Sequence, residues 1–125
     1  MVDALLVVVG AGPYGLAVAA YARRVGIETV VFGEPMAFWR AHMPRGMFLR
    51  SGPDWHLDAT GVHTFKAYLA ERGLDPADVE PIPVDLFIEY ATWFQDIVGL
   101  QVRPDLVSAV RRHENAFEID LDGGG

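Results

Sequence analysis

The pattern of apolar and polar positions divides the first quarter of the chain into strand, helix and strand. Residues 4–9 form a continuous apolar run, which is typical of a parallel strand buried on both faces. A helical pattern begins at Pro13 and ends with Arg23 and Arg24, whose charges complement the negative end of the helix dipole. Residues 27–32 then predict a second strand. The pattern therefore indicates the start of an α/β fold.

The stretch 35–63 lacks regular periodicity and is interrupted by several prolines and glycines. Loops of this length are usually functional or disordered, and the four large aromatic residues of this one argue against disorder. We therefore expect an ordered, functional loop.

Two helices are predicted after this loop. Thr64 is the expected N-cap of a helix that ends at Gly73. A stronger helix is predicted over residues 85–98, beyond a proline-rich joint. Its aromatic and aliphatic residues recur at helical spacing and are interpreted as core: Phe87, Tyr90, Trp93, Phe94 and Ile97.

The last part of the chain predicts strands. Residues 100–103 form a short strand, and residues 105–111 and 116–121 alternate as the two arms of a β-hairpin. Phe117, Ile119 and Leu121 are expected to share one face of it. The expected architecture is a parallel sheet with a helical excursion and a β-hairpin, in one domain that spans residues 1–125.

Composition narrows the possible partners. The net charge of −7 comes from 17 acidic and 10 basic side chains without a basic stripe, so no nucleic-acid partner is expected. The sequence holds no cysteine, and its histidines show no metal-ligand spacing with carboxylates, so no metal site is expected.

The apolar stretch 5–22 is too interrupted for a membrane span and lacks the positive start of a signal peptide. We expect a cytoplasmic protein that does not bind membranes.

The most specific motif is GAGPYG at residues 10–15, between the first strand and the first helix. Gly10 permits a tight turn, Gly12 lets the backbone approach a pyrophosphate, and Gly15 lets helix and strand pack closely. Free N–H groups at the start of the helix then bind the phosphates, with support from the helix dipole. This strand–turn–helix context predicts a dinucleotide site.

An acidic residue about 20 residues further on is expected to bind the ribose. Gly33 occupies the expected position and Glu34 follows it, so Glu34 is the candidate, with a solvated turn carboxylate as the alternative. No arginine follows Glu34 closely (Arg40 is distant), which disfavours NADP at this particular site.

GAGPYG, followed by a long aromatic loop, helices and a hairpin, resembles the FAD domain of two-dinucleotide flavoproteins. The similarity is greatest to NAD(P)H-dependent flavin monooxygenases, including those that hydroxylate amines. The resemblance implies a Rossmann-like FAD-binding domain and FAD as the cofactor. Its motif residues would line the FAD site: Gly10, Gly12, Pro13, Tyr14 and Gly15.

Further positions follow only from this resemblance. Trp39 lies where these enzymes carry the tryptophan of a turn, and residues 43–51 look like the segment that passes the flavin ring. Arg50, within that segment, is expected near the flavin or its pyrophosphate, with a plain surface arginine as the alternative. Residues 81–94 resemble the helix before the hairpin, and Val107 would lie beside the adenine.

The resemblance implies an FAD-dependent oxidoreductase that uses NAD(P)H, most simply a monooxygenase acting on a small molecule. A flavin reductase or dehydrogenase without oxygen activation, and a non-catalytic nucleotide-binding module, are the alternatives. No catalytic residue is assigned, and His56 is interpreted as a plain polar contact. The later FAD motif and the nicotinamide-binding motif are absent from this sequence. We therefore expect the N-terminal portion of a longer flavoprotein, inactive alone, whose sheet is completed by a further segment or a partner chain.

Overall fold

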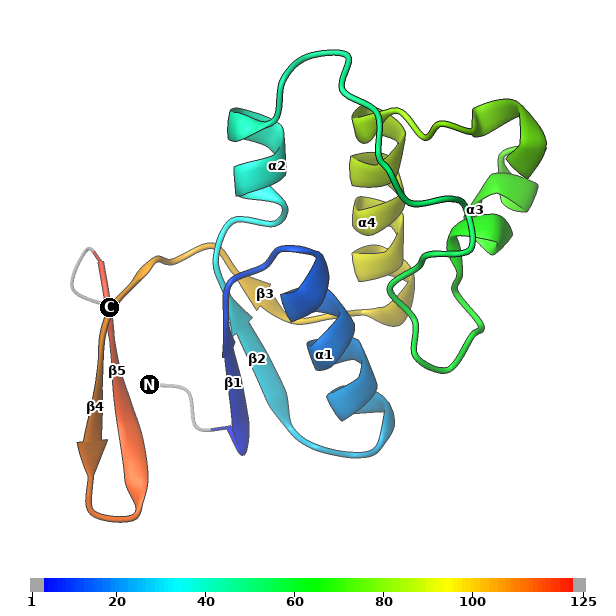
Figure 1. The fold of residues 1–125 in the computed structure, drawn as a ribbon. Coiled ribbons are helices and arrows are strands. Elements are labelled where there is room, and N and C mark those ends of the chain that lie inside the picture. Colours follow the sequence, from blue (N-terminus) through cyan, green and yellow to red (C-terminus); the bar gives the residue numbers. More distant parts are fainter. Residues whose placement is uncertain (1–3, 123–125) are drawn as a thin grey trace.

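A three-stranded parallel sheet forms the centre of the computed structural model, which describes residues 4–122. Its strands are β1 (Leu6–Val9), β2 (Thr29–Phe32) and β3 (Val102–Arg103), in the order β1-β2-β3 (Figure 1). The predicted Rossmann-like α/β fold is confirmed. Among the described residues, β1 and β3 each pair only with β2, so both edges of the sheet are free.

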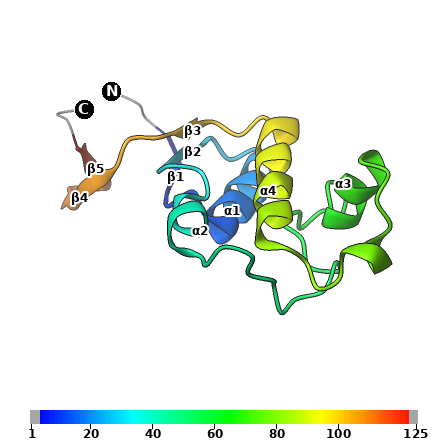
Figure 2. The same cartoon turned by 90° about the horizontal axis from the view of Figure 1, so that it is seen from above.

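Two helices cover one face of this sheet. α1 (Pro13–Arg24) and α4 (Val84–Val98) pack on each other and on the side chains of Val8, Val31 and Val102 (Figure 2). Because side chains alternate along a strand, the neighbouring residues Phe32 and Arg103 project to the opposite face.

The segment 35–63 contains a helix that the sequence did not predict, α2 (Ala37–His42). The expectation of an unbroken loop was wrong because tertiary contacts, and not periodicity, stabilise this six-residue helix. The N–H of Met36 donates to the Ala11 carbonyl oxygen at 2.9 Å just before the helix begins. The Trp39 ring packs on Phe87 of α4, with 5.3 Å between the ring centroids.

The second half of the chain forms α3 (Phe65–Glu71), a 3₁₀ helix η1 (Pro76–Val79) and α4. Thr64 caps α3 as predicted, since its hydroxyl oxygen accepts from the Ala67 N–H at 3.1 Å. Aromatic side chains fill the contact between α3 and α4: Phe65, Tyr68, Tyr90, Trp93 and Phe94.

Ile97, expected in the core, is 46% exposed, whereas its neighbour Val98 packs against the core. Within residues 4–122, no helix is both long enough and apolar enough to cross a membrane.

A buried tyrosine joins the loop before α3 to α4. The Tyr90 hydroxyl donates to the His63 carbonyl oxygen at 2.8 Å and accepts from the Leu57 N–H at 3.0 Å. Burial raises the pKa of Tyr90 to about 12. Inside the same loop, burial acts to raise the pKa of Asp58, but hydrogen bonds from Thr60 and from the His63 N–H outweigh it and lower the pKa.

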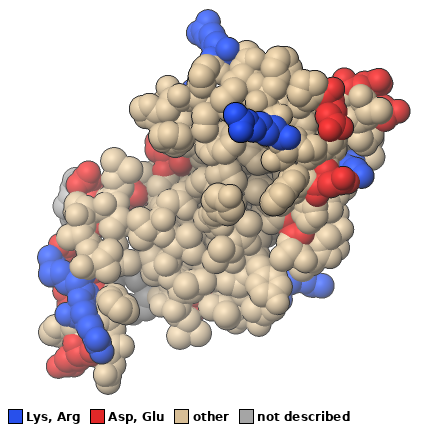
Figure 3. Space-filling view, viewed as in Figure 1, with Lys and Arg blue, Asp and Glu red and all other residues tan. Residues whose placement is uncertain are grey.

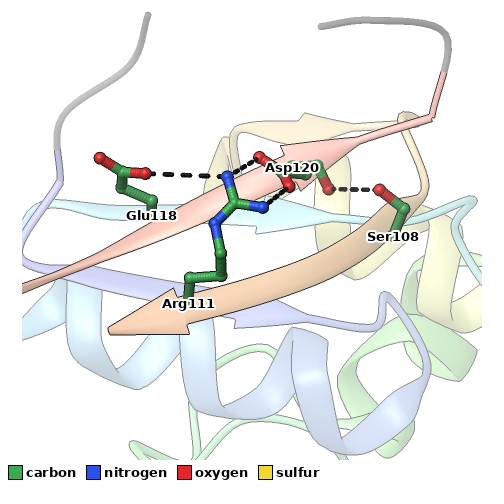
Figure 4. Close-up of polar contacts among 4 residues, drawn as sticks. All are labelled: Ser108, Arg111, Glu118 and Asp120. Atoms are coloured by element: carbon green, nitrogen blue, oxygen red, sulfur yellow. Dashed lines mark hydrogen bonds and ion pairs between the residues drawn. The ribbon is translucent and has the colours of Figure 1, made fainter. Parts of the chain in front are cut away.

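The predicted hairpin is confirmed, with its first arm shifted by two residues: β4 (Val107–His113) pairs antiparallel with β5 (Ala116–Leu121). It lies beside the sheet, away from α4 (Figures 1 and 2). On its polar face, Arg111 makes a bidentate contact with Asp120 and an ion pair with Glu118 (Figure 4). Phe117 shares the other face with Ile119 and Leu121 and is 70% exposed.

Candidate dinucleotide-binding site

Gly10 directs the chain from β1 into the turn before α1. Its φ of +111° is a backbone conformation that L side chains rarely adopt, so glycine is required. Its N–H donates to the Phe32 carbonyl oxygen at 2.8 Å, which ties the turn to the end of β2. The turn therefore lies at the carboxyl edge of the parallel strands, where open α/β sheets bind ligands.

Gly15 brings α1 against the turn. A Cβ at this position would overlap the Gly10 carbonyl oxygen and lie 3.4 Å from Cγ1 of Val8. Only a residue without a side chain allows the helix to approach the strand this closely, which is the role assigned to the third glycine of the motif.

Gly12 differs from both. It is the N-cap of α1 with a φ of −81°, a conformation open to any residue. No described atom lies within 4 Å of the position that a Cβ would occupy. The protein itself therefore does not require glycine here. The space beside Gly12 is open, and it adjoins the start of α1, where the backbone N–H groups of a helix are available to an anion.

The residue after β2 explains why the acidic residue of the motif is displaced. Gly33 has a φ of +137°, and a Cβ there would lie 3.2 Å from the Ala11 amide nitrogen. A glutamate or aspartate at this position would be strained and would press on the turn. The acidic residue follows as Glu34, whose side chain is exposed.

Backbone hydrogen bonds fix Glu34 beside the turn. The N–H of Gly33 donates to the Arg103 carbonyl oxygen at 2.8 Å, and the N–H of Met36 donates to Ala11. Glu34 lies between these two attachments, so its backbone lies near the glycine turn and its side chain is exposed. Its contact with a ribose stays a prediction.

The remaining site candidates lie on different elements. Pro13 is the first residue of α1, and Tyr14, next to it, is 88% exposed. Trp39 packs between α2 and α4, and Val107 begins β4 opposite Leu121. Arg50 is exposed in the segment beside the start of α4. The contacts between described residues do not bring Trp39, Arg50 or Val107 against the glycine turn, and their roles toward FAD stay predictions.

His56 makes a local contact, in which its Nδ1 accepts from the Asp58 N–H at 3.2 Å. In the part of the chain between residues 4 and 122, no three metal-ligating side chains gather at one point.

Arg103 is a residue that the sequence analysis missed. Pairing of β3 with β2 places it beside Phe32 and Gly33 at the carboxyl edge of the sheet. Its guanidinium carbon lies 5.4 Å from the centroid of the Phe32 ring, and its Nε lies 3.4 Å from an Asp105 carboxylate oxygen. The sequence signal for Arg103 was a single basic residue at the end of a short predicted strand. Only the order of the strands in the sheet shows that this residue lies beside the end of β2.

Charged side chains are unevenly distributed over the face of the molecule that Figure 3 shows. In the view of Figure 3, blue and red atoms gather over the hairpin and along the outer helices, and the area between them is largely uncharged. Part of the apolar surface comes from α1, where Val18 and Tyr21 are each more than half exposed, and from Val25, which follows the helix.

Three solved structures show which proteins share this fold. A flavin monooxygenase from Stenotrophomonas maltophilia (a Q193R H194T mutant) is 24% identical, with a TM-score of 0.78, and is matched over 100% of this chain. The lysine monooxygenase NbtG from Nocardia farcinica is 20% identical over 94% of this chain, with a TM-score of 0.76. The bacillithiol disulfide reductase Bdr from Staphylococcus aureus is 18% identical over 98%, with a TM-score of 0.70.

The match covers only part of each of those proteins: 35% of the flavin monooxygenase, 39% of NbtG and 35% of Bdr. No family model matches the chain, and no curated protein matches its sequence. The chain therefore has the α/β fold of about a third of these monooxygenase and reductase chains.

Proposed function

We propose that residues 1–125 are the FAD-binding part of a longer NAD(P)H-dependent flavin oxidoreductase, and that the longer protein is a monooxygenase. The observation that carries this proposal is the open space at Gly12, in a turn whose other two glycines are required by the protein itself. The similar folds of a flavin monooxygenase and a lysine monooxygenase support the flavin and the reaction class.

Each part of the site has a defined task in this proposal. The N–H groups of the first turn of α1 bind the FAD pyrophosphate, with the helix dipole as support. Gly12 leaves room for the phosphates, and the Glu34 carboxylate accepts hydrogen bonds from the ribose hydroxyls. FAD, when bound, would supply the redox chemistry, which is hydride acceptance from NAD(P)H and electron transfer to oxygen. Trp39 and Arg50 are proposed to face the flavin end.

A reductase without oxygen activation is the second candidate. The fold is shared with the disulfide reductase Bdr at a TM-score of 0.70, which favours this alternative. The two functions differ in the fate of oxygen: a monooxygenase incorporates one oxygen atom into the substrate, whereas a reductase does not. A non-catalytic nucleotide-binding module would bind ADP and carry no flavin.

The longer protein is proposed to include the segments that this chain lacks. The matched structures are about three times as long as this chain, and β1 has a free edge among the described residues. We propose that a further segment or a partner chain adds a strand there, and that a second cradle outside this chain holds the nicotinamide cofactor. On this basis the 125-residue chain alone is inactive. Location in the cytoplasm stays a prediction.

The test is Gly12→Val, measured as FAD affinity by flavin fluorescence. Since the Cβ position is empty in the protein, the variant is expected to keep its secondary structure while the isopropyl group occupies the space of the pyrophosphate. We expect a loss of FAD affinity of about a hundredfold or more.

Ala70→Val is the matched control, because it places the same side chain at an exposed position of α3. Retention of full FAD affinity by Gly12→Val would contradict the proposal.

A further inference from the structure

Arg103 presents a flat cation at the edge of the sheet where the ligand is proposed to lie. Its guanidinium rests on the ring of Phe32, which is buried, and its side chain is 37% exposed. The guanidinium carbon thus lies over the phenyl ring, and part of the Arg103 side chain is open to solvent. A guanidinium held in this way resembles an aromatic platform in shape, because it is planar and weakly hydrated.

The position of Arg103 follows from the hydrogen bonds of the strand ends. Gly10 donates to Phe32, and Gly33 donates to Arg103, so the glycine turn, the end of β2 and the end of β3 follow one another across the sheet. Two inter-strand spacings, about 10 Å in total, separate the turn from Arg103. An ADP group with its pyrophosphate at the turn and its ribose at Glu34 extends over this distance.

The charge of Arg103 is offset by its neighbour. Asp105 lies two residues further on, with one carboxylate oxygen 3.4 Å from the Arg103 Nε, and both side chains are about two-thirds buried. A paired guanidinium attracts a phosphate less than a free one, since the carboxylate repels the same anion. The face available to a ligand is thus better suited to a flat, uncharged ring than to a phosphate.

We propose that Arg103 is the adenine platform of this site: the base stacks on the outer face of the guanidinium, which Phe32 supports from below and Asp105 holds in orientation. This inference rests on the proposed dinucleotide function and assigns the adenine end of the ligand to a residue of β3. This platform would give the site a preference for adenine nucleotides whose ribose carries no 2′-phosphate.

The experiment measures ADP binding to the full chain by calorimetry, with Arg103→Ala and Arg103→Lys as the variants. Stacking of a base on a guanidinium predicts that Arg103→Ala weakens ADP about tenfold. Arg103→Lys keeps the charge but has no plane, so a loss close to that of Arg103→Ala is expected. Full ADP affinity in either variant would overturn the proposal.

Arg111→Ala is the matched control, since Arg111 is also paired with carboxylates but lies on the hairpin. The fluorescence of etheno-ADP adds a readout of stacking, with quenching expected in the wild type and lost in Arg103→Ala. Tighter binding of 2′,5′-ADP than of ADP that depends on Arg103 would assign the residue to a phosphate and overturn the platform.

Gly12→Val separates the two proposals. Where Gly12→Val abolishes ADP binding and Arg103→Ala leaves it unchanged, the adenine platform fails and the proposed function stands. Where the wild type does not bind ADP, or Gly12→Val binds it fully, both fail together. Thermal unfolding of each variant shows whether a loss of binding reflects a loss of fold.

Discussion

The Tyr90 hydroxyl donates a hydrogen bond to the His63 carbonyl oxygen at 2.8 Å, across the contact between α4 and the loop that precedes α3. The same oxygen accepts from the Leu57 N–H at 3.0 Å, so one phenol satisfies two backbone groups of that loop. Tyr90 is fully buried, and both partners lose their bond if the hydroxyl is removed.

We expect Tyr90→Phe to lower the free energy of unfolding by about 1–3 kcal/mol, because it leaves two polar backbone groups without their partner. Urea unfolding followed by circular dichroism measures this change. Tyr14→Phe is the control, since the Tyr14 side chain is 88% exposed and its hydroxyl makes no hydrogen bond with a described residue. Equal stability of the two variants would show that the Tyr90 contacts contribute nothing.

The same hydroxyl predicts a dependence of stability on alkaline pH. Burial raises the pKa of Tyr90 to about 12 in the folded chain, against an ordinary value of 10.0. An unfolded chain loses this proton first, so the contribution is complete below pH 10 and is lost as the pH rises toward 12. We expect a loss of about 2 kcal/mol by pH 12.

Comparison of wild type with Tyr90→Phe at pH 8 and pH 11.5 isolates this effect. The pKa of Tyr68 is also raised, but Tyr68 is present in both proteins and its contribution cancels. An identical pH dependence in the two proteins would exclude Tyr90 as its source.

The two glycines at the start of α1 are expected to respond differently to alanine. Gly15→Ala places a methyl group against the Gly10 carbonyl oxygen and should lower the free energy of unfolding by about 1–3 kcal/mol or more. Gly12→Ala places the methyl group in open space and should change stability by less than about 1 kcal/mol. Thermal unfolding without ligand compares them, and a larger loss for Gly12→Ala would contradict the described packing.

Glu34 is expected to contribute to FAD binding without contributing to stability. Hydrogen bonds to a charged group contribute about 1.5–3 kcal/mol, so Glu34→Ala should weaken FAD roughly ten- to a hundredfold. Glu28→Ala removes the same charge at the opposite end of β2 and should leave the affinity unchanged. Titration of FAD into both variants is the measurement, and equal affinities would assign the ribose to another residue.

Much of the fold could be predicted from the sequence, because its determinants are local. The glycine spacing at 10–15 fixes a strand–turn–helix, and the apolar period over α4 predicts its length to within one residue at the N-terminus. The cap at Thr64 is also a local feature. The structure adds the reason for the displaced acidic residue, which is the positive φ of Gly33 and its close approach to Ala11.

The parts that could not be predicted depend on contacts between distant residues. α2 has too few turns for a periodic pattern, and its position depends on Ala11 and Phe87. Arg103 joins the candidate site only because β3 pairs with β2 although residues 33–101 separate them in the sequence, a pairing that no local signal specifies. Arg103 is also far from Glu34 in the sequence, so inspection of the residues that follow Glu34 does not identify it.

The strand order also has a consequence for how the protein is made. Of the three described strands, β1 is synthesised before β2 and β3; β2 pairs with one side of β1, and β3 pairs with the far side of β2. Among the described residues, the other side of β1 has no partner strand at any of these stages. A nascent chain that has already folded its glycine turn would thus keep a template for strand addition exposed during synthesis. The open edge of β1 would then be a site at which the growing chain needs protection from pairing with other chains.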